Sequence, residues 1–363
     1  MERTSTFQLT ALIILFQIGS TSLFLLASDA DRDAWMATLI AMIAGLALLA
    51  FVTLPIQHME PRKNLVEILK SYLGRYVGTA LAFTYILYFC YKSVRNVREY
   101  GDLMIIYMLP NTPLFAIMLI LVLLSGYAVY QGVEVFFRLT EILLPIILLI
   151  YITLIIMLTS SELMDLSRLQ PMLEKGIKPV VKAAIPGVIS FPFGEMVVFL
   201  MLWSFYNGER PMSKVSILSY AFSGLFILIT NISIISSLGP LSTVSTMPFM
   251  LGTSYLQITE LIERMDPFVA LLLFAGVFVK QTTYFLAAVL TASTLFKVKR
   301  RVMILPIGAV IYIGSFLFQS HMAQVWIGFK YNLKYHFPIF QIAIPILLLL
   351  IMHMKKHRMR ERL

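Results

Sequence analysis

Long apolar runs recur along this sequence, and they limit what the chain can fold into. Ile142 to Leu158, for example, is apolar almost without a break. A run of about 18 apolar residues or more is long enough to cross a hydrocarbon core of about 30 Å as a helix. Charged residues make up only 13% of the chain, against about 25% in soluble domains. The sequence therefore predicts a polytopic membrane protein.

The continuous apolar runs favour helices over membrane strands, which alternate polar and apolar residues over about ten positions. We therefore predict an all-α fold, with residues 1–363 forming a single transmembrane domain of about ten transmembrane helices. The lone cysteine, Cys90, excludes an intramolecular disulfide and is expected to be a core thiol. The spans are expected at approximately 6–28, 34–57, 78–107, 113–130, 140–160, 183–204, 214–238, 266–296, 302–320 and 336–354.

The placement of the basic residues predicts the orientation in the membrane. If both termini are cytoplasmic, the inside segments hold 17 of the 29 Lys and Arg residues, and the outside segments, Arg264 among them, hold 8. Cytoplasmic segments carry an excess of Lys and Arg, so both termini are expected inside. The net charge of +10 then reflects topology rather than nucleic-acid binding. The tail from Lys355 to Arg362 is expected to anchor the last helix at the lipid headgroups.

The first span contains a stretch in which small and polar residues replace Leu and Ile. These residues are Gln17, Gly19, Ser20 and Thr21, with Ser22 following. Such a stretch can unwind at membrane depth only if a ligand, ion, water or protein satisfies the freed backbone groups. We therefore predict that these four residues contribute to a ligand site.

The sixth span contains a stronger break. Pro192 has no N–H and disfavours helix at the residue before it, Phe191. Gly194 then permits a turn that other residues resist. Ser190, Phe191, Phe193, Gly194 and Glu195 are the predicted ligand-binding residues around this break.

The two breaks lie about half a chain apart, as expected if the chain consists of two inverted five-helix repeats, approximately 6–160 and 183–354, with broken helices 1 and 6. This arrangement predicts a binding site at the membrane midplane. Glu195 would lie at the positive start of a half-helix and could receive an ammonium group. The alternative is that proline and glycine only kink packed helices.

The third span carries five charges within eleven residues. Each isolated charge would cost roughly 2.5–3.5 kcal/mol at the bilayer centre, so they cannot all face lipid. At 100° per residue they fall on one stripe, together with Tyr88 and Tyr91. Ligand contact is expected for the two tyrosines, and an ion-pair ladder, such as Arg95 with Glu99 or Asp102, for the charges. The five are Lys92, Arg95, Arg98, Glu99 and Asp102.

The eighth span places Lys280 near its middle, and Thr283 and Tyr284 fall on the same helix face. Both are predicted to line the ligand site. Three roles remain open for Lys280: a charge pair with Glu195, an ammonium group filling a cation site, or contact with an anionic ligand.

Motifs for hydrolytic, nucleotide-dependent or metal-dependent chemistry are absent from the sequence, which has no G-x-S-x-G, no G-x-x-x-x-G-K-[ST], no H-E-x-x-H and no Cys/His cluster. We therefore expect no enzyme, no catalytic residues, no metal site and no cofactor.

Several short motifs, in their order and spacing, resemble the spore germination permeases, the B subunits of endospore germinant receptors in the amino acid–polyamine–organocation transporter superfamily. The resemblance covers essentially the whole chain. Its motifs are Phe16 to Ser20 followed by Asp33-Ala34-Trp35, the loop Leu169 to Gly176, the break Ser190 to Glu195, and Val277 to Lys280.

The resemblance implies a fold like that of sodium-coupled amino-acid transporters and a small-molecule germinant bound near the broken helices. It also implies a complex with A and C partner subunits in the inner membrane of the spore. A germinant-binding, non-enzymatic receptor subunit is therefore the first expectation. An ion-coupled amino-acid or amine transporter is the alternative, because a fold alone permits either function. A structural subunit or ion pathway is the third.

Overall fold

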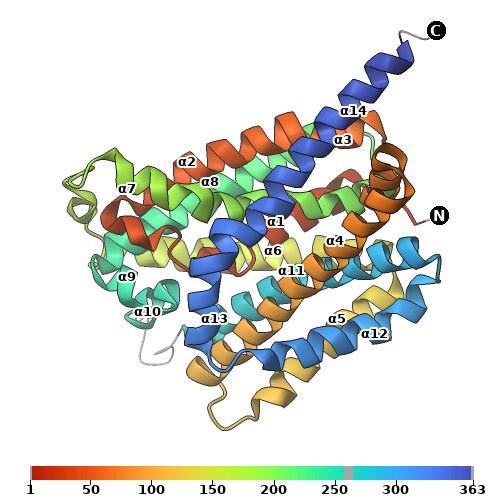
Figure 1. Cartoon of the computed structure of the whole chain (residues 1–363). Helices are drawn as coiled ribbons and strands as arrows, with labels where there is room; N and C mark the ends of the chain where they lie inside the picture. Colours follow the sequence, from red (N-terminus) through yellow and green to blue (C-terminus); the bar gives the residue numbers. More distant parts are fainter. Residues whose placement is uncertain (1, 257–264, 361–363) are drawn as a thin grey trace.

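The computed structural model describes residues 2–256 and 265–360, and helices account for nearly all of its regular structure. Ten segments within this part are long and apolar enough to cross a membrane, in agreement with the sequence prediction (Figure 1). They are Thr6–Leu23, Ser28–Met59, Leu65–Tyr107, Leu114–Gln131, Val133–Thr159, Ile177–Met201, Met212–Leu238, Asp266–Phe296, Arg300–Leu317 and His321–Lys356. Arg264 and Arg362, used in the orientation prediction, lie outside the described residues.

The longer and shorter α-helices follow one another along the chain as α1 (Thr6–Ile18), α2 (Ala34–Leu48), α3 (Leu54–Met59), α4 (Leu65–Tyr107), α5 (Leu114–Gln131), α6 (Val133–Thr159), α7 (Ile177–Lys182), α8 (Met212–Leu238), α9 (Leu241–Val244), α10 (Pro248–Ser254), α11 (Asp266–Phe296), α12 (Arg300–Gly314), α13 (His321–Ile327) and α14 (Ile344–Arg360). Short 3₁₀ segments are η1 (Thr21–Leu23), η2 (Ser28–Asp33), η4 (Leu166–Leu169), η6 (Phe193–Met201), η7 (Trp203–Phe205) and η8 (Ser315–Leu317); π-helical segments are η3 (Leu49–Thr53), η5 (Ala183–Val188), η9 (Gly328–His336) and η10 (Ile339–Ala343).

The first and eighth spans form the centre of the bundle. In each, 83% of the apolar window is buried, whereas in the ninth span, which contains α12, only 22% is buried. α4 packs along α11, and α1 packs against α6, α8 and α11. The outer helices turn apolar side chains such as Phe51 and Leu305 outward, where lipid is their natural solvent. The central helices are therefore the ones that can enclose a polar site.

Segments predicted to lie on one side of the membrane meet at one end of the bundle, and both termini lie there (right side of Figure 1). Glu2 accepts a hydrogen bond from the Val133 amide and pairs with Arg300 at 2.6 Å. At the opposite end, Lys175 pairs with Asp31 at 2.7 Å. These contacts agree with the predicted alternation of loops between two faces.

The last span differs from the prediction, which placed residues 321–335 in a loop. The chain is instead helical from His321, through α13 and the π-helical turns of η9, so that the span covers His321–Lys356. Lys330 and Lys334 lower the hydropathy of this stretch, so hydropathy alone does not predict that it is part of a membrane-spanning helix. Lys330 lies over the rings of Trp326, at 4.4 Å, and Tyr331, at 5.5 Å, whereas Lys334 is exposed.

Candidate functional site

The first helix breaks where the sequence predicts. α1 ends at Ile18, and Gly19 leaves the helical conformation before the short turn η1. The Tyr151 hydroxyl donates to the Gly19 carbonyl oxygen at 2.6 Å, which satisfies an acceptor that the helix end leaves free. A Cβ atom on Gly19 would lie 3.1 Å from the Gly276 carbonyl oxygen. The glycine therefore allows α1 and α11 to meet backbone to backbone.

The sixth helix breaks at Phe191 and Pro192, which form a turn between the helical residues that end at Ser190 and the 3₁₀ segment η6. Two backbone hydrogen bonds between residues three apart hold this turn. The Phe191 amide donates to the Val188 carbonyl and the Glu195 amide donates to the Pro192 carbonyl, both at 3.2 Å. This geometry places Glu195 in the first turn of η6 and at the centre of the bundle.

Three charged side chains from different helices meet at this break. Lys92 from α4 and Lys280 from α11 both form ion pairs with Glu195, Lys92 with Oε1 and Lys280 with Oε2, the latter at 2.7 Å. Lys92 is 4% exposed, Lys280 1% and Glu195 0%. We call these three residues the charge cluster. Charges this deeply buried are tolerated only with close partners, so the cluster holds α4, η6 and α11 together.

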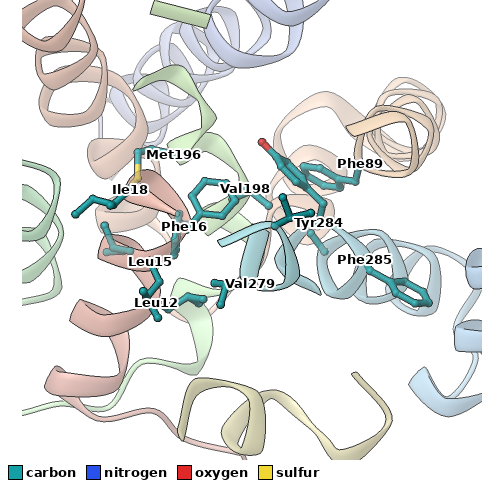
Figure 2. Packing of buried hydrophobic residues seen from close by; sticks show 14 of the residues in the cluster. Leu12, Leu15, Phe16, Ile18, Phe89, Met196, Val198, Val279, Tyr284 and Phe285 are labelled. Carbon is teal, nitrogen blue, oxygen red and sulfur yellow. The ribbon is translucent and has the colours of Figure 1, made fainter. Parts of the chain in front are cut away.

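Aromatic rings cover the two ammonium groups of the charge cluster. Lys280 Nζ lies 4.1 Å from the ring centre of Phe191 and Lys92 Nζ lies 5.5 Å from it. Phe337 lies 4.0 Å from Lys92 Nζ. Cations over aromatic faces are attracted by the ring quadrupole. Figure 2 shows Tyr284, whose ring centre is 5.4 Å from Lys92 Nζ, beside Phe16 and Phe89 in the surrounding core.

Several polar side chains around the breaks are buried without a hydrogen-bond partner among the described residues. Gln17 has neither amide atom bonded, and the hydroxyls of Ser22 and Ser190 also lack protein partners. Buried polar groups are nearly always bonded to protein, water or ligand. The unpartnered groups on the two interrupted helices can therefore form hydrogen bonds with a polar ligand or with water.

Most of the predicted ligand-binding residues lie around these two breaks. Thr21 accepts a hydrogen bond from Lys280 Nζ at 3.4 Å, which links the first break to the charge cluster. Tyr88 accepts one from Gln341 at 2.8 Å, and a Cβ atom on Gly194 would lie 2.6 Å from the Gln341 amide oxygen. Gln17, Gly19, Ser20, Thr21, Tyr88, Ser190, Phe191, Gly194, Glu195 and Tyr284 all lie on the elements that form or flank the two breaks.

Three predicted residues have other contacts. The Tyr91 hydroxyl accepts a hydrogen bond from Asn332 at 2.8 Å, and its ring lines a groove between α4 and the last span. The ring of Phe193 packs on Tyr220. The Thr283 hydroxyl donates to the Val279 carbonyl in its own helix at 2.7 Å. None of these recorded contacts is to the charge cluster. A ligand role for the three residues stays a prediction.

The contacts of Lys280 match one of its three open roles, because its ammonium pairs with Glu195. The predicted ladder in the third span takes a different form. Arg98, rather than Arg95, holds Asp102, through Nε at 2.9 Å. Arg95 instead donates to the Gln324 carbonyl at 3.1 Å. The i to i+4 spacing of Arg98 and Asp102 places them on one face of α4.

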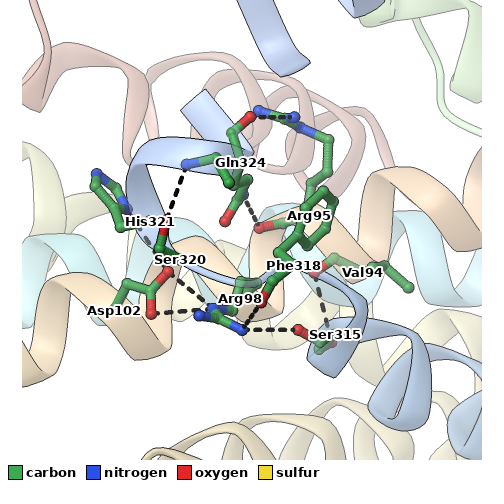
Figure 3. A network of polar contacts seen from close by, with 10 residues as sticks. Val94, Arg95, Arg98, Asp102, Ser315, Phe318, Ser320, His321 and Gln324 are labelled. Carbon is green, nitrogen blue, oxygen red and sulfur yellow. Dashed lines mark hydrogen bonds and ion pairs between the residues drawn. The ribbon is translucent and has the colours of Figure 1, made fainter. Parts of the chain in front are cut away.

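Figure 3 shows how this second polar network fastens the last span to α4. Arg98 also donates to the carbonyl oxygens of Phe318 and Ser315, at 2.5 and 3.4 Å. Gln324 returns a hydrogen bond to the Arg95 carbonyl at 2.9 Å. The network satisfies the carbonyls where α12 and η8 end, so its role is to hold the turn between the last two spans.

Lys92 belongs to the charge cluster and not to the ladder predicted for the third span, and Phe337 and Gln341 were not among the predicted site residues. A signal for Lys92 exists in the sequence. Arg95 and Arg98 each have an acidic residue four positions later, whereas Lys92 has none within one helical turn on either side. A charge without a partner on its own helix has to find one on another. Phe337 and Gln341 carry no such signal, because only the tertiary fold brings the last span over the break.

Comparison with known proteins identifies the family. The model of the family described as spore germination protein matches residues 3–323. The chain belongs to this family. It is 32% identical to spore germination protein KB of Bacillus subtilis (strain 168), over 99% of this chain and 97% of that protein. It is 25% identical to spore germination protein YndE of the same strain, over 98% of both chains.

Solved structures confirm the fold. The crystal structure of MhsT in complex with L-phenylalanine superposes with a TM-score of 0.64 at 13% identity, covering 97% of this chain and 88% of that one. Mhp1, a nucleobase-cation-symport-1 family transporter with bromovinylhydantoin bound, gives a TM-score of 0.58 at 14% identity, covering 93% and 75%. The germination protein is thus a multi-pass membrane protein with a transporter-type fold of two inverted five-helix repeats and broken helices 1 and 6.

Proposed function

We propose that this chain is the germinant-binding membrane subunit of an endospore germinant receptor. Membership of the spore germination protein family supports a role in spore germination. The charge cluster carries the assignment of the site, because it lies where the two broken helices meet α4 and α11. The ligand is a small molecule, such as an amino acid, bound at the midplane.

In this proposal the protein acts by binding and not by catalysis. A ligand can shift a helix bundle only if it binds one conformation better than another. The interrupted segments are suited to such a change, because η1 and η6 are 3₁₀ segments, whose hydrogen-bond geometry is poorer than that of an α-helix, and the polar groups of Gln17 and Ser190 lack protein partners. Ligand contacts that satisfy these groups would stabilise one arrangement of the breaks.

The family and the charge distribution support finer assignments of partners, membrane and orientation. We propose that the subunit works with the A and C subunits of the receptor, in the inner membrane of the spore, and that both termini are cytoplasmic. The inside segments hold the larger share of the basic residues, and the termini lie at one end of the bundle. No nucleic-acid partner is part of this proposal.

Cysteine protection tests the site directly. In a Cys90→Ser chain, a cysteine at Ser190 would report on the break, and a cysteine at exposed Ser254 would serve as the control. Membranes are treated with a maleimide in the presence of pools of L-amino acids, sugars or nucleosides. We expect one pool to slow labelling at position 190 and leave position 254 unchanged. Equal labelling rates with every pool would contradict ligand binding at the break.

The fold likeness to Mhp1, described as a transporter, supports an ion-coupled amino-acid or amine transporter as the second candidate. Proteoliposomes containing the purified chain separate the two functions. Accumulation of the protecting compound that depends on a proton or sodium gradient would favour the transporter. Binding without accumulation, together with loss of germination in spores that carry a Ser190→Trp chain, would favour the receptor subunit.

A further inference from the structure

The positive and negative charges of the charge cluster do not cancel. It contains two ammonium groups and a single carboxylate, and all three side chains are at most 5% exposed. In the described part of the chain, no second carboxylate lies within ion-pair distance of either lysine. When both lysines are protonated, the cluster therefore carries one excess positive charge at the centre of the bundle.

The neighbours of the two lysines do not remove this excess. The faces of Phe191 and Phe337 attract a cation but carry no net negative charge, and the Thr21 hydroxyl is also a neutral partner. Transfer of an unpaired ammonium group out of water costs several kcal/mol even after the protein relaxes. An anion beside the two ammonium groups would supply the missing charge.

Both oxygens of Glu195 are already engaged, one by each lysine. The expectation that Glu195 receives a ligand's ammonium group would require a third cation at a site with an excess of cations. Electrostatics favours the opposite sign of ligand. Phe191 marks the place, because among the described residues its ring is the one aromatic group recorded close to both lysines, at 4.1 and 5.5 Å.

We propose that the charge cluster binds an anion, and that the anion takes the place of the Phe191 ring over Lys92 and Lys280. The anion is either the carboxylate of an organic ligand or a small inorganic ion. Ser190, the residue before Phe191, supplies a buried hydroxyl group that has no hydrogen-bond partner among the described residues and can donate to an anion. This inference rests on the proposed function and adds the chemical class of the ligand.

Isothermal titration of the purified full-length chain in nanodiscs of zwitterionic lipid tests the charge class. The probes are sodium acetate, sodium chloride and methylammonium gluconate, with sodium gluconate as a bulky anion control at equal ionic strength. We expect acetate to bind and methylammonium not to bind. Binding of acetate alone indicates a carboxylate site, and equal binding of chloride indicates a site for a small inorganic anion.

Substitutions in the charge cluster should change the acetate affinity in predictable directions. Lys280→Gln removes the excess charge but leaves the Lys92–Glu195 pair, so acetate affinity should fall by at least about tenfold. Lys92→Gln should have the same effect, which keeps the test valid if one variant does not fold. Glu195→Gln should instead raise acetate affinity, because both ammonium groups are then unpaired. Lys334→Gln removes one exposed charge from the last span and should change nothing.

Three results would overturn the inference: absence of acetate and chloride binding by the unmodified chain, affinity unchanged by both lysine variants, or loss of acetate binding in folded Glu195→Gln. Binding of glucose or inosine, unaffected by Lys280→Gln, without acetate binding would refute the anion class and leave the ligand-binding proposal intact. Acetate binding together with full germination of Lys280→Gln spores would leave the anion site intact and refute its role as the germinant site.

Discussion

Gly19 and Gly276 meet backbone to backbone where the broken first helix crosses α11. A Cβ atom on Gly19 would lie 3.2 Å from the Gly276 Cα atom, and one on Gly276 would press on the main chain of Gly19 and Ser20. Backbone atoms cannot rotate away as a flexible side chain can. The crossing therefore fixes how close the first break lies to Lys280, which is on the same helix as Gly276.

Gly276→Ala is expected to destabilise the protein by about 1–3 kcal/mol, the usual cost of overpacking. Gly126 is the matched control, because a Cβ atom there would have no neighbour closer than the Phe285 ring at 3.5 Å. Gly126→Ala should be neutral or stabilise its helix by up to about 1 kcal/mol. Thermal unfolding in detergent measures both, and equal midpoints would show that the crossing is not tightly packed.

The Tyr151 hydroxyl should stabilise the first break. Tyr151→Phe removes the donor to the Gly19 carbonyl and leaves that oxygen buried without its partner, so a loss of about 0.5–1.5 kcal/mol is expected. Tyr76→Phe is the control, because Tyr76 is 88% exposed. The same thermal unfolding assay applies. A Tyr151→Phe protein as stable as the Tyr76→Phe protein would mean that water replaces the hydroxyl at no cost.

The second polar network predicts an order among three variants. Arg98→Met removes the arginine partner of the buried Asp102 carboxylate, which keeps His321 Nδ1 at 3.7 Å, and frees the Phe318 carbonyl, so a loss of about 3–5 kcal/mol is expected. Asp102→Asn should cost less, because Arg98 keeps its carbonyl acceptors. Glu99→Gln should cost least, since the described structure records no ion pair for Glu99. Denaturant unfolding measures the order, and a Glu99→Gln protein less stable than Arg98→Met would refute it.

The sequence was sufficient to predict the spans and both breaks, because hydropathy and the placement of Pro192 and Gly19 act locally. It was not sufficient for the last span, where Lys330 and Lys334 interrupt the apolar run although the chain stays helical. The charge cluster was predicted in part. Glu195 and Lys280 are conspicuous in apolar spans, but the contact of Lys92 with the same carboxylate depends on the packing of α4 against α11.

The charge cluster predicts how its variants combine. Lys280→Met leaves Glu195 paired with Lys92, and Lys92→Met leaves it paired with Lys280, so each single change should be modest. Glu195→Gln strands two buried ammonium groups and should be the most harmful single change, by about 3–5 kcal/mol. The measurement is the unfolding free energy of detergent-solubilised protein in gluconate buffer.

Double and triple variants separate a three-membered cluster from a simple pair. If Lys280 and Glu195 formed an isolated pair, adding Glu195→Gln to Lys280→Met would restore stability, because no charge would remain. In the cluster seen here the same double variant leaves Lys92 buried and alone, so it should be less stable than Lys280→Met. Only the further change Lys92→Met should recover most of the loss, because it removes the last unpaired charge. Recovery already in the double variant would show that Lys92 does not share the carboxylate.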